Sequence, residues 1–458
     1  MASSMSRKRA NQLRQSTVSS CLTRWKRDLN PCRGICSPLP RLSAIPPGQL
    51  RGATERTTGL EPATLTLARL CATNCATSAK HPNCISTAAV QRGGTLQEHS
   101  AASQTEVSLV CRAYRVTVQA MQGSAVWQGH EYRDPVRAVA DWDIDSEHFW
   151  FLAATFEGQC VAVAFRERVP LTPSNASWPG VPRDAWTSSL DGAQYCDAVR
   201  RTREYIAAGD VYQANICRVL SAPIPSGSTL RGLWRLLHAR HGAPFSGYID
   251  IPAGQFDALP DGLGIVSSSP ELFLQRRGMT LLTAPIKGTA PTESELLPKD
   301  RAENLMIVDL MRNDLASISR PGTVSVPKLF ALEPHPGLVH LVSYVQSRVD
   351  EQFTWEDVRM HLLPPGSVSG APKSSAVRII EELEGRTRGF YCGAFGIAHG
   401  DEADLAVGIR SFFRVGDRLE FGTGAGITWG SDPHGEWLET ELKAARLLAV
   451  ASEQGSAK

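Results

Sequence analysis

The feature that most constrains this chain is a change in patterning near residue 106. Residues 1–105 show no sustained apolar period of 2 or 3.6, whereas periodic segments follow one another from about Val107 onwards. The first hundred residues carry 14 Lys and Arg against 4 Asp and Glu, a net charge of +10, and the other 358 carry 34 against 42, a net charge of −8. A segment this polar and poor in aromatics cannot build a packed core. We therefore expect residues 1–105 to be a disordered extension or the product of a misassigned start site.

Composition and cysteine placement narrow the class of protein. No stretch approaches the roughly 18 consecutive apolar residues that a membrane span needs, so we expect no membrane partner. The 11 cysteines are scattered and the N-terminus lacks a secretory apolar core, which indicates a reducing compartment, here the cytoplasm. The pairs Cys32/Cys36 and Cys71/Cys75 lack the periodic context of a zinc site. A transit peptide or a nucleic-acid arm are alternatives for the extension, and we expect no nucleic-acid partner for the folded part.

Helix-like and strand-like periods are mixed after residue 106, which predicts an α+β fold. The strand-like segments are residues 114–118, 149–165, 257–273, 279–283, 338–349, 390–398, 403–414 and 418–428. The helix-like segments are residues 191–209, 293–318, 373–383 and 436–451. No internal repeat of about 20–50 residues and no strand-flanked GxGxxG is present, which excludes solenoids and dinucleotide-binding folds.

Two of the predicted helices carry carboxylates suited to a metal ion. Glu436, Glu439 and Lys443 are spaced i, i+3 and i+7, so they share one face of the last helix. Two carboxylates on one face can hold a hard divalent cation such as Mg²⁺. The alternative is an exposed helix in which the Glu439–Lys443 pair contributes about 0.2–0.5 kcal/mol. Glu303 lies beside the apolar stripe of the helix at 293–318, where an ion could bridge it to the C-terminal pair.

Two glycine-rich motifs suggest contacts with a ligand. The sequence GSVSGAPK (366–373) is a turn of small residues that enters a helix, with proline near the first helical turn. We expect exposed amides there, which favour anions. The sequence GTGAG (422–426) ends a predicted strand with three glycines, which permits close approach of a ligand to the backbone. A plain tight turn is the alternative for this second motif.

Taken in order, these motifs resemble those of the chorismate-utilising enzyme family. The resemblance extends from about Tyr205 to the C-terminus. The matching segments are GDVYQANI (209–216), SSSPELFL (267–274), PIKGT (285–289), DRAENLMIVDLMRNDL (300–315), LVHLVS (338–343), GSVSGAPK, RGFYCGAFG (388–396), GIRSF (408–412), GTGAGI (422–427) and EWLETELKA (436–444). The resemblance implies a large α/β sandwich of two packed antiparallel sheets with outer helices. It also implies a shortened N-terminal part at 106–190 and a chorismate-binding catalytic domain at 191–458.

The resemblance also implies the parts of an active site. Chorismate carries two carboxylates, and Mg²⁺ would grip the ring carboxylate while Arg410 pairs with the side-chain carboxylate, a role that suits its planar fork. Glu271 would be the general acid that protonates the C4 hydroxyl, and His340 occupies a further catalytic position. The Mg²⁺ ligands would be Glu303, Glu436 and Glu439, with Asp300 adding an outer contact. The other substrate-binding residues would be Gln213, Thr289, Tyr391, Lys443 and the amides of Gly424 and Gly426.

Two positions discriminate between branches of this family. Gln213 stands where the branches that add water carry a lysine, which argues against water addition. Lys287 is the variable residue of PIKGT, where anthranilate synthases usually have alanine. A neutral lysine amine is a nucleophile, so the resemblance favours the aminodeoxychorismate synthase branch, which forms 4-amino-4-deoxychorismate for p-aminobenzoate through a covalent lysine adduct. Anthranilate synthesis and a non-catalytic chorismate-binding protein are the alternatives.

The reaction implied by the resemblance needs ammonia. None of the 11 cysteines lies in a turn typical of a glutaminase nucleophile. The resemblance therefore implies a heterodimer with a glutamine amidotransferase subunit that supplies the ammonia. The tryptophan-binding motif of feedback-inhibited anthranilate synthases is missing, which also favours the aminodeoxychorismate branch.

Overall fold

The computed structural model describes residues 89–91, 106–111, 114–119, 121–335 and 338–454, in two units divided after Gln119. In the first unit the strands form an antiparallel sheet in the order β1-β3-β2. These strands are β1 (Ala89–Gln91), β2 (Glu106–Cys111) and β3 (Tyr114–Gln119). The strand predicted at 114–118 is confirmed. Of the predicted extension 1–105, all but Ala89–Gln91 lies outside the described residues.

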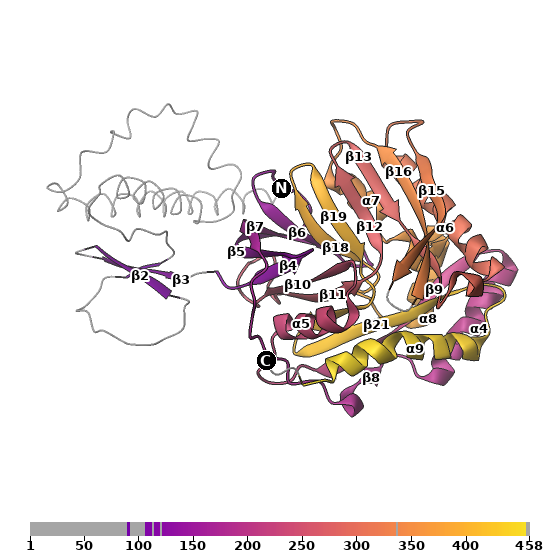
Figure 1. The fold of residues 1–458 in the computed structure, drawn as a ribbon, viewed down its shortest axis with the longest axis horizontal. Coiled ribbons are helices and arrows are strands. Elements are labelled where there is room, and N and C mark those ends of the chain that lie inside the picture. The colour runs from indigo at the N-terminus through magenta and orange to yellow at the C-terminus, as the bar shows by residue number, and fades with distance from the viewer. Residues whose placement is uncertain (1–88, 92–105, 112–113, 120, 336–337, 455–458) are drawn as a thin grey trace, which may run out of the picture. The chain divides into compact units, whose positions relative to one another are not determined.

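The second unit is built on one continuous antiparallel sheet of 18 strands (Figure 1). Hydrogen bonds connect one half in the order β9-β21-β20-β11-β10-β4 and the other half in the order β6-β18-β19-β12-β13-β16. Two strands, β5 and β7, pair with each other and join the halves through β4 and β6. The strands of the first half are β9 (Gln213–Pro223), β21 (Arg418–Ile427), β20 (Ser411–Val415), β11 (Leu263–Ser269), β10 (Phe245–Ile251) and β4 (Ser124–Trp127). Those of the second half are β6 (Phe149–Ala154), β18 (Ala394–His399), β19 (Glu402–Val407), β12 (Leu272–Arg277), β13 (Thr280–Ala284) and β16 (Leu338–Arg348). The joining strands are β5 (His130–Val139) and β7 (Cys160–Pro170), and the remaining strands are β8 (Thr187–Ser188), β14 (Ile286–Ala290), β15 (Ser325–His335) and β17 (Gly370–Ala371).

Aromatic contacts show that the two halves pack face to face. Trp127 of β4 makes edge-on contacts, 6.0 Å between ring centroids, with Phe151 of β6 and with Phe395 of β18. Phe395 in turn contacts Phe413 of β20 at 6.2 Å. Each such pair contributes about 0.5–1.5 kcal/mol beyond its burial. The predicted sandwich of two packed antiparallel sheets is therefore confirmed, with the addition that β5 and β7 connect the two layers.

Helices cover the outside of this sandwich, as predicted (Figure 1). Three of them, α4, α5 and α9, contact the first half of the sheet through β9, β10, β11 and β21. Helix α8 contacts β9, and α6 contacts β14, β16 and α7. The helices are α4 (Gly192–Ala208), α5 (Leu230–His241), α6 (Pro298–Ile318), α7 (Trp355–Leu362), α8 (Lys373–Glu384) and α9 (Pro433–Ala451). None of the described helices is long and apolar enough to span a membrane.

Local chemistry explains where the elements begin and end. Asp191 caps α4 by accepting from the Gln194 backbone N–H, and Gly209 ends it at φ 86°, as the sequence predicts. The helix predicted from 293 begins later, at Pro298, because proline disfavours helical geometry in the residue before it. Only a short 3₁₀ turn, Glu293–Glu295, precedes it. The predicted strand at 149–165 is two strands, β6 and β7, separated by a turn.

Candidate active site

The nucleophile candidate Lys287 lies on β14, where helix α6 comes close to the strand. The next residue, Gly288, has φ +92°, and a Cβ placed on it would lie 2.8 Å from the Asp300 Cβ of α6. Only glycine tolerates both this backbone geometry and this approach. The glycine of PIKGT therefore lets the helix that carries Glu303 lie against the strand that carries Lys287.

The environment of Lys287 favours a neutral amine. Removal of its side chain from water lowers the pKa of Lys287, and the nearby Lys443 ammonium lowers it further. The carboxylates of Glu271, Glu303 and Glu439 oppose this shift, but the net direction is downward. A lysine with a lowered pKa holds more of the nucleophilic form near neutral pH.

Glu271 has the opposite shift. It lies between β11 and β12, with 4% of its surface exposed, and this burial raises the pKa of its carboxyl. A hydrogen bond from Ser367 and the positive charges of Lys287 and Arg410 oppose the rise. The environments therefore move the Glu271 pKa up and the Lys287 pKa down, which is the pattern of an acid and a nucleophile in one site.

The carboxylates of Glu303 on α6 and of Glu436 on α9 both interact electrostatically with that of Glu439 on α9. Burial raises the pKa of Glu303, and the charges of Asp300 and Glu439 raise it further. Burial also raises the pKa of Glu436, again with a contribution from Glu439. Burial and mutual repulsion therefore both raise the pKa of these carboxyls.

The present side-chain positions do not yet form a closed metal site. Among the residues that the structure describes, no group of three acidic, histidine or cysteine side chains is close enough to hold one ion. Glu439 is about half exposed and is ion-paired with Lys443 at 2.6 Å. The donor chemistry of Glu303, Glu436 and Glu439 suits Mg²⁺, and the metal site stays a prediction.

Strand β21 places three glycines against the side chains of this region. A Cβ on Gly426 would lie 2.1 Å from Gln213 Nε2 and 3.7 Å from Lys287 Nζ, so this glycine brings the two side chains together. A Cβ on Gly424 would lie 2.4 Å from Cys217 Sγ, and the Gly424 carbonyl accepts a hydrogen bond from Lys443 Nζ at 2.9 Å. Side chains of the protein therefore approach the GTGAG backbone closely, and the approach of a ligand stays a prediction.

Other predicted residues lie around this centre at different depths. Arg410 has a backbone φ of +50°. Burial lowers the pKa of its guanidinium, and the negative charge of Glu271 opposes this shift. Thr289 Oγ1 and His340 Nδ1 are hydrogen-bonded at 2.8 Å across β14 and β16. Tyr391 is buried and its hydroxyl donates to Cys217 Sγ at 3.5 Å. Their roles toward a substrate stay predictions.

The motif GSVSGAPK differs from its expected role. Residues 366–371 are buried, and the Ser369 N–H donates to the Gly366 carbonyl, so the amides expected to be exposed to an anion are enclosed. Ser367 instead hydrogen-bonds Glu271, and Lys373 Nζ pairs with Asp314 at 2.7 Å. The turn therefore contacts Glu271, the predicted acid, and its small residues did not reveal this contact because the partner is remote in sequence.

Sequence reasoning also missed Asn304. This α6 residue is 1% exposed and hydrogen-bonds the carbonyl of Leu341 and, at 3.5 Å, that of Lys287. The only signal available was its place beside Glu303 in the DRAENL segment.

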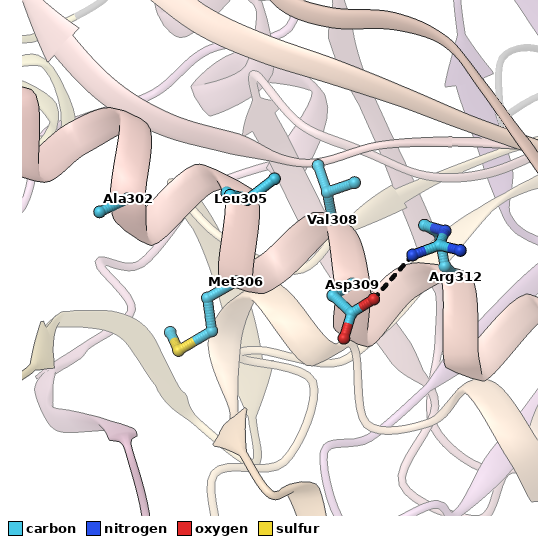
Figure 2. A pocket seen from close by; sticks show the side chains of 6 residues that line it. All are labelled: Ala302, Leu305, Met306, Val308, Asp309 and Arg312. Carbon is cyan, nitrogen blue, oxygen red and sulfur yellow. Dashed lines mark hydrogen bonds and ion pairs between the residues drawn. The ribbon is translucent and has the colours of Figure 1, made fainter.

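A groove of about 460 Å³ runs along the exposed side of α6 (Figure 2). Most of its lining is apolar, and Asp309 and Arg312, one turn apart on α6, form an ion pair at 2.8 Å. The lining residues are Ala302, Leu305, Met306, Val308, Asp309 and Arg312. None of these belongs to the predicted site, so within the described residues the groove and the candidate active site are different features of the same helix.

Comparison with known proteins defines the class. Residues 71–449 match the family described as chorismate binding enzyme. Solved structures of similar fold include anthranilate synthase component I of Streptococcus pneumoniae (TM-score 0.59, 20% identity, 76% of this chain and 95% of that chain). Another is MenF, the menaquinone-specific isochorismate synthase of Escherichia coli (TM-score 0.59, 17% identity, 73% and 90%). Because the family match covers more than half of the chain, the protein belongs to the chorismate binding enzyme family.

Curated relatives indicate two kinds of family member. Aminodeoxychorismate synthase component 1 of Klebsiella aerogenes is 37% identical over 281 residues, 58% of this chain and 59% of the relative. Anthranilate synthase component 1 of Streptomyces coelicolor is 36% identical over 318 residues, 66% of this chain and 58% of the relative. The chain spans less than two thirds of the length of these curated relatives.

Proposed function

We propose that the protein converts chorismate and ammonia to 4-amino-4-deoxychorismate, the activity of an aminodeoxychorismate synthase component 1. The observation that carries the proposal is the pair of Lys287 and Glu271, an amine with a lowered pKa beside a carboxyl with a raised pKa. Membership of the chorismate binding enzyme family and the similarity to the Klebsiella aerogenes protein support it. The product would be the precursor of p-aminobenzoate and hence of folate.

In the first step the neutral amine of Lys287 attacks C2 of chorismate. Both ring double bonds shift by one position and the C4–O bond breaks. Glu271 gives its proton to the departing hydroxyl, which leaves as water. The step leaves a secondary ammonium joining Lys287 to C2, and Glu271 becomes a carboxylate.

In the second step ammonia attacks C4, both ring double bonds shift back and the C2–N bond breaks. Lys287 leaves as a neutral amine, because its positive charge disappears with the bonding pair that it takes. The new ammonium at C4 returns one proton to Glu271. The net reaction is chorismate plus ammonia giving 4-amino-4-deoxychorismate plus water, with both side chains restored.

Other side chains would hold and orient the substrate. Arg410 would pair with the side-chain carboxylate of chorismate, and Lys443 would assist together with the Gly424 and Gly426 amides. Ammonia would come from a glutamine amidotransferase partner in the cytoplasm. Direct attack by ammonia at C2, which leads to anthranilate, is the second candidate, and the Streptomyces coelicolor relative favours it.

Product identification tests this proposal. The full chain is incubated with chorismate, Mg²⁺ and an ammonium salt, and products are separated by chromatography. We expect 4-amino-4-deoxychorismate and no anthranilate. Anthranilate as the main product would replace the proposal with the second candidate. If the protein consumes no chorismate, a non-catalytic binding protein would be favoured.

The carboxylates of Glu303, Glu436 and Glu439 would hold Mg²⁺, which would supply positive charge for the ring carboxylate of chorismate. Chelation should therefore abolish chorismate turnover, and added Mg²⁺ should restore it. Without substrate, Mg²⁺ at about a hundred times its Kd should stabilise the fold by about 2.7 kcal/mol, seen as a higher unfolding temperature. Glu436→Gln should lose this rise, whereas the exposed Glu402→Gln should keep it. An undiminished rise in Glu436→Gln would place the ion elsewhere.

A further inference from the structure

Helix α6 is tied to the lysine strand by one buried amide. Asn304 Nδ2 donates to the Leu341 carbonyl of β16 at 3.1 Å and to the Lys287 carbonyl of β14 at 3.5 Å. Asn304 Oδ1 accepts from Ser343 Oγ at 2.5 Å. One side chain therefore connects the helix to two neighbouring strands.

The surrounding groups determine how this amide is oriented. Ser343 Oγ already accepts a hydrogen bond from the Phe330 N–H at 3.0 Å, so its own hydrogen is free to be donated to Asn304 Oδ1. The carbonyls of Lys287 and Leu341 can only accept, so they must face Nδ2. Reversing the amide would set Oδ1 against both carbonyl oxygens, acceptor to acceptor. A buried network satisfied in one orientation specifies one arrangement of its elements.

A second contact sets the distance between the same helix and strand. Asp300, one turn before Asn304, approaches Gly288 so closely that a Cβ on the glycine would lie 2.8 Å from the Asp300 Cβ. The two contacts touch β14 beside Lys287, and Glu303 belongs to the turn between them. Gly288 sets how near the helix lies, and Asn304 sets its position along the strand.

We infer that Asn304 is a positioning residue, which fixes the Lys287 backbone relative to the turn of α6 that carries Glu303. This inference rests on the proposed function, in which Lys287 is the nucleophile. Without Asn304 the carbonyls of Leu341 and Lys287 lose this donor, and the helix and strand lose their common anchor. A misplacement of about 1 Å at a reacting group can cost on the order of a hundredfold in rate.

The test compares Asn304→Leu with Ser343→Ala in the full chain. Leucine has a similar volume but no donor for the two carbonyls. Ser343→Ala removes the bond to Oδ1 and the acceptor for Phe330, but it keeps both Nδ2 bonds. We expect Asn304→Leu to lower kcat for chorismate consumption by about thirtyfold to a hundredfold, with KM within about threefold. Ser343→Ala should lower the unfolding temperature while kcat stays within about threefold.

The inference would be overturned if kcat fell in proportion to the unfolding temperature in both variants. An unchanged kcat in Asn304→Leu would also overturn it. If Asn304→Leu fails to fold, Asn304→Ser takes its place, because it leaves room for a water that bridges the two carbonyls. The serine variant should lose more kcat than Ser343→Ala, and a kcat equal to that of Ser343→Ala would count against the inference.

Hydrogen exchange separates this inference from the proposed function. In Asn304→Leu, backbone amides of residues 286–290 should exchange faster than in the unsubstituted protein, whereas in Ser343→Ala the increase should centre on Phe330. The proposed function is tested separately, by whether chorismate is consumed and by which product is formed. If the unsubstituted protein consumes no chorismate, the proposed function fails, and unchanged exchange at 286–290 in Asn304→Leu would then refute the positioning role by itself.

Discussion

Replacing Lys287 with alanine should reduce formation of 4-amino-4-deoxychorismate by a factor on the order of 10³ or more. The proposed path forms a covalent bond between this amine and C2, and no other group can supply that bond. Ammonia could then attack C2 directly, so the remaining turnover, if any, should give anthranilate. Chromatography of the products, with mass spectrometry of the peptide that contains Lys287 after quenching, measures both the loss and the adduct.

Lys287→Arg is the matched control for charge. Arginine keeps the positive charge but is not deprotonated in proteins and so cannot act as a nucleophile. We expect it to be as inactive as the alanine variant. Either variant forming the same product at a rate near that of the unsubstituted protein would contradict covalent catalysis by this lysine.

Glu271→Gln should lower kcat by about 10²–10⁴, because glutamine cannot protonate the departing hydroxyl. The reactive state needs Glu271 protonated and Lys287 neutral. With the Glu271 pKa raised and the Lys287 pKa lowered, kcat/KM should fall as pH rises through the Glu271 pKa and also as pH drops below the Lys287 pKa. The profile is measured as kcat/KM across pH at saturating ammonia.

The fall of kcat/KM that follows loss of the Glu271 proton should disappear in Glu271→Gln, while the fall assigned to Lys287 should remain. The exposed Glu381→Gln serves as a control and should leave the profile unchanged. A Glu271→Gln variant that keeps both limbs and most of its rate would assign the acid role to another group.

Local signals in the sequence predicted the elements that carry the site more accurately than the way those elements pack. Asp191 and Gly209 fixed the ends of α4 because capping depends on neighbouring residues alone. The packing of the two layers depends on partners far apart in the chain, such as Trp127 with Phe395. The residues near either side chain give no indication of this contact. Periodic patterns of apolar residues predict local elements and do not reveal long-range contacts of this kind.

The site shows the same division. Lys287, Glu271 and Glu303 were predicted from the motifs, and the structure places their charges within reach of one another. The supporting groups were not predicted. Ser367 and Asn304 act on residues of other elements, so their roles follow only from the packing of a turn against a carboxyl and of a helix against a strand.

The joining of the two layers through β5 and β7 has a consequence for how this unit can be divided. Early strands β4 and β6 lie in different layers, and later strands return to each layer in turn, so neither layer is a contiguous piece of chain. Neither layer can therefore be produced as a separate fragment. Much of the native pairing joins residues remote in sequence, which is typical of slow folding, on the scale of milliseconds to seconds or longer. In nascent chains one edge of β4 stays unpaired until β10 has been synthesised, and one edge of β6 until β18 has been synthesised. Both early strands are therefore exposed to aggregation during synthesis.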